Sequence, residues 1–267
     1  MRSRFVRFLV FGLLVSSARG QTAGLDAQRL FEKGMDALTG VGVSHSEPDA
    51  LDNFHRSADL AYSPAQVVMG YFCETGTIVP ADPAQAAEWY RKAAKQGDRL
   101  GGWLLGRLYF TGSGVPRDLD QAEAALQKSA MLGDPFGQYL LGMVKLERND
   151  YVSAAPWLRR AAMQGLPQAQ QQLGETLKQG KTGTVDKLEA YVWLLVSFDA
   201  GNQSAAASAT QLEAELGTVQ SEKGRKKARD LEQTVSRAVV SRGCSGWNGE
   251  FAPIPTPPPP DIQRFCR

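Results

Sequence analysis

The stretch MGYFCETGTIVPADPAQAAEWYRKAAKQGD, residues 69–98, decides the fold. Apolar residues surround Gly70 in its first part, and Gly76 interrupts the helix that they predict. Asp82 and Pro83 then suit the N-cap and the first helical position of a second helix. Gly97 suits the end of that helix. The stretch therefore predicts two helices joined by a glycine-containing loop.

The same arrangement recurs along the chain with a period of 36 residues and a single interval of 32. Several independent columns share this period, which argues against chance agreement. The short interval places one four-residue deletion in the loop after Leu146. The columns are Gly34, Gly70, Gly106, Gly142 and Gly174; Gly97, Gly133, Gly165 and Gly201; Ala50, Ala86, Ala122, Ala154 and Ala190; and Trp89, Trp157 and Trp193, with Ala125 in the missing place.

An aspartate recurs at the expected start of four of the second helices, where its carboxylate can accept a hydrogen bond from a free backbone N–H as an N-cap. In three of these units a glutamine or glutamate follows three residues later, the spacing of a capping box. The N-cap residues are Asp82, Asp118, Asp150 and Asp186, with Ser46 in the first unit; the capping-box partners are Gln85, Gln121 and Glu189.

Residues 69–98 and 105–134 resemble Sel-one-like repeats, which are relatives of tetratricopeptide repeats. The positions that carry the resemblance are Val79, Pro80, Asp82, Ala86, Trp89, Lys92, Ala93, Ala94 and Gly97. The resemblance covers about residues 27–202, and the first unit departs from it, with Asn53 in place of the tryptophan and Ala61 in place of the closing glycine. It implies an all-α fold, an α-solenoid of about five antiparallel helix-pair repeats followed by a C-terminal capping helix.

Four segments follow from this interpretation. Residues 1–20 are expected to be a signal peptide, residues 21–202 the repeat solenoid, residues 203–241 a helical capping segment, and residues 242–267 an irregular proline-rich tail. The expected capping helix, about Ser221–Val240, has a narrow apolar stripe of the kind that closes a terminal repeat. The stripe comprises Gly224, Ala228, Leu231, Val235 and Ala238.

The N-terminus has the composition of a secretory signal peptide. Three arginines precede the short apolar run Phe8–Val15, and small residues flank Arg19 before an expected cleavage at about Gly20. The chain without residues 1–20 has 26 basic and 28 acidic residues, a net charge of −2, which argues against nucleic-acid or anionic-membrane partners. No later segment is long and apolar enough to cross a membrane. We expect a monomeric protein that is exported to the periplasm or secreted.

The tail leaves two questions open. A disulfide between Cys244 and Cys266 is favoured over two free thiols, since export permits it. Pro253–Pro260 favours a polyproline II conformation, either as a solvated tail or as a recognition segment.

The stretch GETLKQGKTG, residues 174–183, nearly matches a nucleotide-binding P-loop, whose lysine and threonine open a helix. The repeat assigns Gly174 to the glycine column of the first helices and Gly180 to the loop column of Gly40, Gly76 and Gly112. The next helix is expected only at Asp186, whose charge would repel phosphate. We therefore interpret Lys181 and Thr182 as parts of an ordinary inter-helix turn.

No residue pattern for a metal site, a cofactor site or a catalytic centre stands out. His45 is expected in a loop and His55 on a helix surface, and neither belongs to a metal-binding motif. Cys73 is expected to be a buried, unreactive thiol. Trp89, Trp157 and Trp193 are expected in the core.

The resemblance implies that the first helices line a concave groove. The positions three before and one after each first-helix glycine are then expected to face a partner, with packing between repeats as the alternative for each. The residues assigned to partner binding are Val67, Tyr71, Trp103, Arg107, Tyr139, Met143 and Gln171, and Phe31, Met35 and Glu175 share their register. Exposed aromatic residues and methionines of this kind are typical of interface anchors.

These features predict a non-catalytic scaffold of the cell envelope or secreted space that binds a protein or peptide. The alternative is an envelope hydrolase that acts on cell-wall material with acids such as Glu74 and Glu175.

Overall fold

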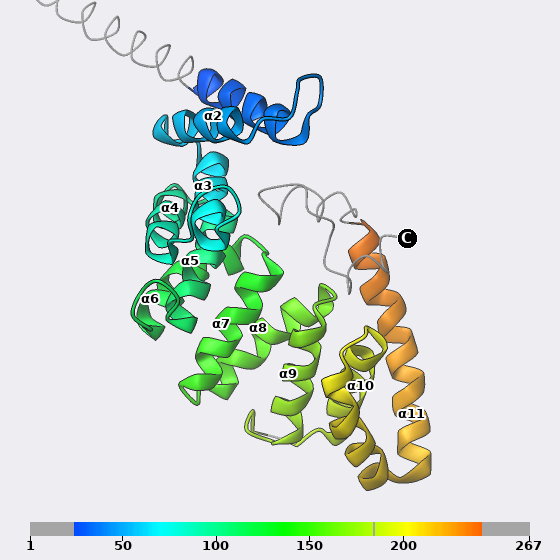
Figure 1. Cartoon of the computed structure of the whole chain (residues 1–267). Helices are drawn as coiled ribbons and strands as arrows, with labels where there is room; N and C mark the ends of the chain where they lie inside the picture. The colour runs from blue at the N-terminus through cyan, green and yellow to red at the C-terminus, as the bar shows by residue number, and fades with distance from the viewer. Residues whose placement is uncertain (1–23, 184, 242–267) are drawn as a thin grey trace, which may run out of the picture. The chain divides into compact units, whose positions relative to one another are not determined.

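The structure is a computed structural model that describes residues 24–183 and 185–241, and the side chains of these residues up to 236 (Figure 1). The described residues form helices and no strands. The expected signal peptide, Cys244, Cys266 and Pro253–Pro260 lie outside them. The predicted all-α class with helix-pair repeats and a capping helix is confirmed.

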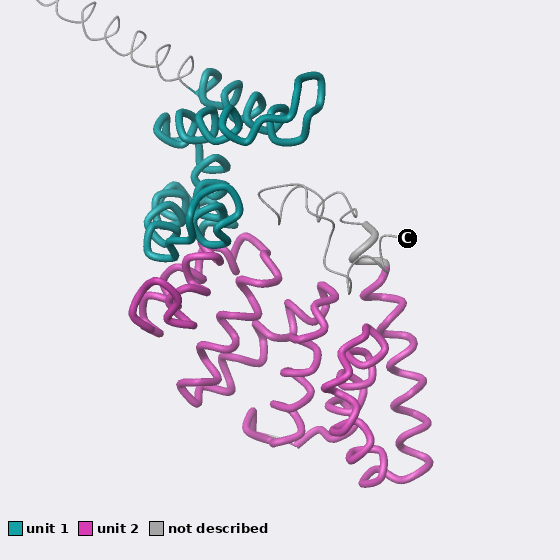
Figure 2. The backbone as a smooth tube through the Cα atoms, in the orientation of Figure 1, with its two compact units in different colours: residues 1–101 teal, residues 102–267 magenta. Residues whose placement is uncertain are grey.

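The chain divides into two compact units, residues 1–101 and residues 102–267 (Figure 2). Within unit 1, helical residues 24–39 precede α2 (Glu47–Asp59), α3 (Ser63–Thr75) and α4 (Pro83–Lys95). Helix α5 (Arg99–Thr111) begins in unit 1 and continues into unit 2. Unit 2 continues with α6 (Leu119–Met131), α7 (Pro135–Glu147), α8 (Tyr151–Met163), α9 (Pro167–Lys178), α10 (Lys187–Asp199), the short 3-10 helix η1 (Gln203–Ala205) and α11 (Ala206–Ser241).

A glycine in the first helix of every repeat, here called helix A, is in contact with a large side chain of the second helix, helix B. A Cβ atom built on Gly142 would lie 2.8 Å from Cδ2 of Leu158, and one built on Gly174 would lie 2.7 Å from Cγ of Leu194. Both leucines are completely buried. The other pairs are Gly34 with Phe54, Gly70 with Tyr90, and Gly106 with Leu126. The glycine column thus lets the two helices of a repeat pack directly against each other.

The loop between helices A and B is tied back to helix A by the N-cap residue of helix B. The Asp82 N–H donates to the Cys73 carbonyl at 2.7 Å, and the Asp118 N–H donates to the Tyr109 carbonyl at 3.0 Å. The aspartate side chains accept from the helix, as predicted; for example, the Gln85 N–H donates to Asp82 Oδ1 at 3.0 Å. The reciprocal bond expected of a capping box is absent at these two residues, because their N–H groups already have carbonyl partners.

The predicted deletion lies between α7 and α8. Asn149 adopts a positive φ of 59° there, and Asp150 directly follows it as the N-cap of α8. Beside this shortened loop, Arg148 forms ion pairs with Asp120 and with Glu123, the latter at 2.7 Å. These ion pairs join the end of α7 to α6.

Helix α11 covers α10, as expected for a capping segment. Gly217 interrupts the helix with non-helical angles, so residues 206–216 and residues 218–241 form two consecutive helical parts. The ring of Tyr191 packs against Gly224, where a Cβ atom would lie 2.6 Å from Cδ1 of the ring. Val192, Val196 and Ala228 form a small buried cluster between the two helices.

We expect Gly142→Ala to lower the free energy of unfolding by about 1–3 kcal/mol, because the added methyl group overlaps Leu158. Urea unfolding followed by circular dichroism measures this change. Gly24→Ala is the control, since nothing lies within 4 Å of its Cβ position. Adding Leu158→Ala to Gly142→Ala should cost less than the sum of the two single substitutions. Additive costs would contradict the contact.

We expect Ala61→Gly to raise stability by about 1 kcal/mol, because Ala61 adopts a φ of 62° where later repeats have glycine. Thermal unfolding measures the change. The reverse substitution, Gly133→Ala, should lower stability by a similar amount: Gly133 has a φ of 88°, and no atom lies within 4 Å of its Cβ position. A neutral result at both positions would show that backbone conformation does not limit these turns.

Candidate functional site

The positions predicted to bind a partner differ widely in exposure. Val67 is only 1% exposed, so its assignment to a partner-binding surface is wrong. The reason is that α3 packs against both α2 and α4, which together cover this face. Tyr71, one turn further along α3, is partly exposed.

In unit 2 the predicted positions on helices A are partly exposed. The rings of Trp103 and Phe136 stack with their centroids 5.2 Å apart, and the Arg107 guanidinium lies 5.8 Å from the Trp103 ring. Tyr139 packs against the core cluster of α8, α9 and α10, and burial raises the pKa of its hydroxyl. Met143 is partly exposed on the same helix.

Gln171 has a structural role in unit 2. Its Oε1 atom accepts hydrogen bonds from Asn202 Nδ2 at 2.9 Å and from Ser204 Oγ at 2.7 Å. These bonds connect α9 to η1 and to Asn202, the residue directly before it. Gln171 is therefore already engaged within the protein.

The P-loop interpretation fails on geometry. Gly174 lies within α9 against Leu194, and α10 begins at Lys187, well after Thr182. Lys181 Nζ donates to the Tyr151 hydroxyl at 2.9 Å and lies 4.5 Å from the centroid of its ring. The turn is thus one of the inter-helix loops of the repeat, as predicted.

The other chemically reactive side chains have ordinary surroundings. His45 Nδ1 lies 2.8 Å from the Leu38 carbonyl, and His55 pairs with Asp59 on an exposed surface. Cys73 is a buried free thiol whose pKa is raised by burial and, to a lesser extent, by the charge of Asp82. Among residues 24–183 and 185–236, no group of histidine, cysteine, aspartate and glutamate residues could hold a metal ion.

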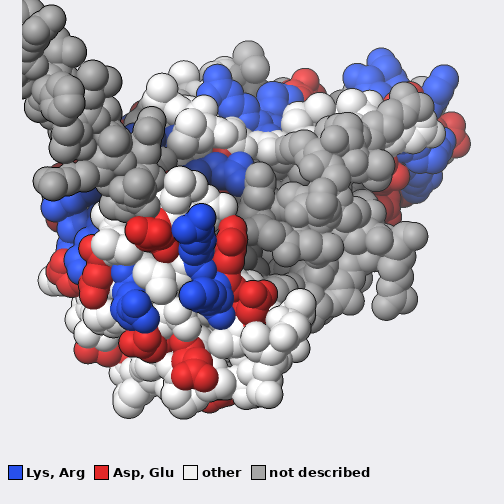
Figure 3. Space-filling model, turned by 90° about the horizontal axis from the view of Figure 1, so that it is seen from above, with Lys and Arg blue, Asp and Glu red and all other residues white. Residues whose placement is uncertain are grey.

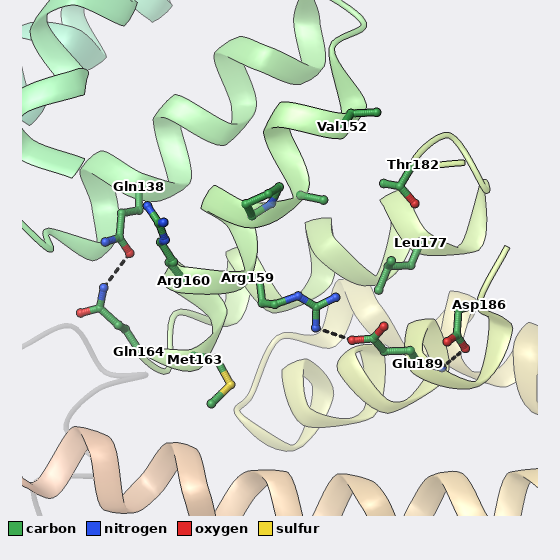
Figure 4. A pocket seen from close by; sticks show the side chains of 12 residues that line it. Gln138, Val152, Arg159, Arg160, Met163, Gln164, Leu177, Thr182, Asp186 and Glu189 are labelled. Carbon is green, nitrogen blue, oxygen red and sulfur yellow. Dashed lines mark hydrogen bonds and ion pairs between the residues drawn. The ribbon is translucent and has the colours of Figure 1, made fainter. Parts of the chain in front are cut away.

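A surface that the sequence did not predict lies along α8 (Figure 4). It is an open cleft of about 860 Å³, which we call the α8 cleft. Most of its apolar lining lies on α8 and includes Val152, which is 68% exposed, and Leu177 of α9 adds to it. The complete lining is Gln138, Val152, Ala155, Pro156, Arg159, Arg160, Met163, Gln164, Leu177, Thr182, Asp186 and Glu189.

The two arginines of the α8 cleft differ in their partners. Arg159 forms an ion pair with Glu189, which also accepts a hydrogen bond from Trp193 Nε1 at 3.3 Å. Arg160 is exposed, and its guanidinium lies 4.5 Å from the centroid of the Trp157 ring. No carboxylate of the described residues pairs with Arg160. The α8 cleft therefore offers one positive charge to an acidic ligand.

Pro156 adds a backbone acceptor to the α8 cleft. It lies inside α8 and has no N–H, so the carbonyl of Val152 lacks its usual helical donor. Both residues line the cleft. A ligand with an N–H group can supply the missing donor.

The sequence contained only weak signals for this cleft. Its arginines and valine lie on the outer side of a helix B, where single charged and apolar residues are common. The proline inside α8 was the one available signal. All three repeat tryptophans were expected in the core. Trp89 and Trp193 are buried there, but Trp157 is partly exposed beneath Arg160.

The distribution of surface charge agrees with the nearly equal numbers of basic and acidic residues in the chain. On the face drawn in Figure 3, basic and acidic side chains lie intermixed. Of the helices in the described part of the chain, none combines the length and the hydrophobicity that spanning a bilayer requires.

Comparisons with known proteins identify the repeat. The Sel1 repeat family model matches residues 63–98, 103–134, 135–166 and 167–202, about half of the chain. The chain is similar to a Sel1 repeat protein from Oxalobacter formigenes, with 25% identity and a TM-score of 0.61, over 78% of this chain and 87% of that one. It is also similar to a protective antigen of uropathogenic Escherichia coli with an SLR fold, with 26% identity and a TM-score of 0.52, over 84% of this chain and 57% of that one. The chain belongs to the Sel1 repeat family.

Proposed function

We propose that this protein is a non-catalytic scaffold that holds a segment of a protein partner in the α8 cleft. Sel1 repeats are a general scaffold for protein interaction, which supports the class of function. The observation that carries the choice of site is the combination, on one helix, of exposed apolar side chains, an arginine that pairs with no carboxylate of the described residues, and a carbonyl without its helical donor.

The chemistry of the α8 cleft defines the partner segment. Val152, Pro156 and Met163 favour apolar side chains, because covering them removes apolar surface from water. Arg160 favours a carboxylate next to those side chains. The Val152 carbonyl favours a backbone N–H. The segment is therefore an apolar peptide with at least one aspartate or glutamate.

The partly exposed helix A positions remain a second proposed contact surface for the same partner. They comprise Tyr71, Trp103, Arg107, Tyr139 and Met143. The stacked rings of Trp103 and Phe136 support this surface, since aromatic side chains are common interface anchors. Val67 and Gln171 are not part of it.

Export and a monomeric state complete the proposal. The arginines before Phe8–Val15 and the small residues near Gly20 support removal of residues 1–20. The partner would then belong to the cell envelope or the secreted space.

The hydrolase alternative receives no support from the acids on which it depended. Glu74 accepts a hydrogen bond from the Tyr90 hydroxyl at 2.9 Å within unit 1. Glu175 lies 3.7 Å from Lys178 Nζ within unit 2. Each acid thus has a partner of its own, and neither lines the α8 cleft.

A peptide selection tests the proposed site. A random peptide library is selected against the full chain, and the affinities of the enriched peptides are measured by fluorescence polarisation. We expect enriched peptides to contain an acid beside apolar residues. Arg160→Glu should weaken their binding by about tenfold, because it replaces an attractive charge with a repulsive one.

Arg229→Glu is the matched control, since Arg229 is an exposed arginine of α11 outside the cleft. It should leave peptide affinity unchanged. An equal loss for Arg160→Glu and Arg229→Glu would contradict the α8 cleft. A loss with Trp103→Ala/Tyr139→Ala, together with no loss for Arg160→Glu, would assign binding to the helix A surface instead.

A further inference from the structure

A pair of glutamines recurs at two of the junctions between successive repeats. In unit 1, Gln66 Nε2 donates to the carbonyl of Ala58, at the end of the preceding helix B, at 3.1 Å. Gln96, just after α4, completes the pair by donating from its Nε2 to Gln66 Oε1 at 2.8 Å. We call this arrangement a glutamine rung. It satisfies both polar atoms of a glutamine that is 4% exposed.

The same rung occurs within unit 2. Gln138 Nε2 donates to the Ala130 carbonyl at 3.1 Å, and Gln164 Nε2 donates to Gln138 Oε1 at 2.7 Å (Figure 4). The spacing between the two glutamines is four residues shorter than in unit 1, which is the deletion between α7 and α8. The rung therefore recurs at two junctions, whereas the repeat formed by α5 and α6 has Gly102 and Leu132 at the corresponding positions.

The last rung is incomplete. Gln170 Nε2 donates to the Ala162 carbonyl at 3.2 Å, as the repeat requires. The position that should supply the second glutamine is occupied by Ala200. Gln170 is only 1% exposed, and its Oε1 atom has no hydrogen-bond partner within the described part of the chain. A buried acceptor without a donor costs stability, so this atom favours a ligand that supplies one.

A hollow lies where the missing side chain would be. Its volume is about 190 Å³, and its walls include Gln170, Val196, Asp199, Ala200, Glu232 and Val235. One water molecule accounts for roughly 30 Å³ of liquid, so the hollow is larger than a single buried water requires. It has the size of a polar head group with part of an aliphatic stem.

The charge of the hollow selects the ligand. Asp199 and Glu232 place carboxylates in the lining, and none of the lining residues whose side chains the structure describes is a lysine or an arginine. A guanidinium group carries five N–H donors and is less strongly hydrated than an ammonium group. We propose that the hollow binds the guanidinium of an arginine side chain, which donates to Gln170 Oε1 and pairs with the carboxylate of Asp199. This site shares no lining residue with the α8 cleft and does not depend on the function proposed for that cleft.

A titration of the full chain with acetyl-arginine-amide tests the proposal. Backbone amide resonances of Val196 and Ala200 in the ¹⁵N-labelled protein report on binding. We expect saturable shifts, and binding of the neutral isostere acetyl-citrulline-amide weaker by about tenfold or more. Equal shifts with both compounds would overturn the proposal, because charge would then play no part.

Three substitutions locate the site. Ala200→Gln supplies the missing rung, so it should abolish the arginine-dependent shifts and raise the melting temperature. Asp199→Asn changes an exposed side chain and should weaken binding about two- to fivefold. Gln164→Ala removes the donor to Gln138 Oε1 from the complete rung. Because Arg159 and Arg160 line the same cleft as Gln138, this variant should not bind arginine at the vacated position. Unchanged binding by a folded Ala200→Gln variant would overturn the proposal, as would a new arginine site in Gln164→Ala.

The arginine could come from another protein or from this chain. Arg242, Arg264 and Arg267 lie outside the described residues, and the full-length variant Arg242→Gln/Arg264→Gln/Arg267→Gln removes them as sources. Binding of acetyl-arginine-amide by the wild type supports an external arginine. Binding only by the triple variant supports an arginine of the chain itself. The absence of saturable shifts in both proteins would overturn the proposal.

Discussion

The contact between a helix A glycine and a large helix B side chain is the interaction on which the rest of the structure depends. Leu158 and Leu194 are completely buried only because Gly142 and Gly174 have no Cβ atom in the way. Side chains packed at crystal density leave no room for an extra methyl group. Once this contact sets the approach of the two helices, the loop bonds of Asp82 and Asp118 and the glutamine rungs at Gln66 and Gln138 occur at equivalent positions of their repeats.

The helix-pair architecture could be predicted from sequence because each of its determinants is local and periodic. Gly142 and Asp150 each belong to a column, and the same residue type at the same spacing defines the same backbone role. The deletion could also be predicted, because it shifts every column equally. The chemistry of the turn was less accessible: the N–H of Asp82 has a carbonyl partner rather than the side chain three residues later.

The binding surface could be predicted only in part, because exposure depends on which neighbours cover a helix. Val67 and Tyr71 share one helix, but the first is buried and the second is partly exposed. The position of a residue in the repeat predicts the direction of its side chain. It does not predict whether a neighbouring helix covers that side chain. The α8 cleft arises from residues of four helices, α7 to α10, and Pro156 is the one lining residue that the sequence makes conspicuous.

The glutamine rung has a consequence for how the protein unfolds. The glycine contacts act inside a repeat, whereas the bond from Gln138 to Ala130 joins two repeats. In a linear array, the first kind of interaction sets the intrinsic stability of a unit and the second sets the cooperativity between nearest neighbours. Since Ala200 leaves the final rung incomplete, the junction of α9 with α10 and α11 contributes less coupling than the junction at Gln138. We expect the C-terminal end of the array to open as a separate unit before the repeats on its N-terminal side.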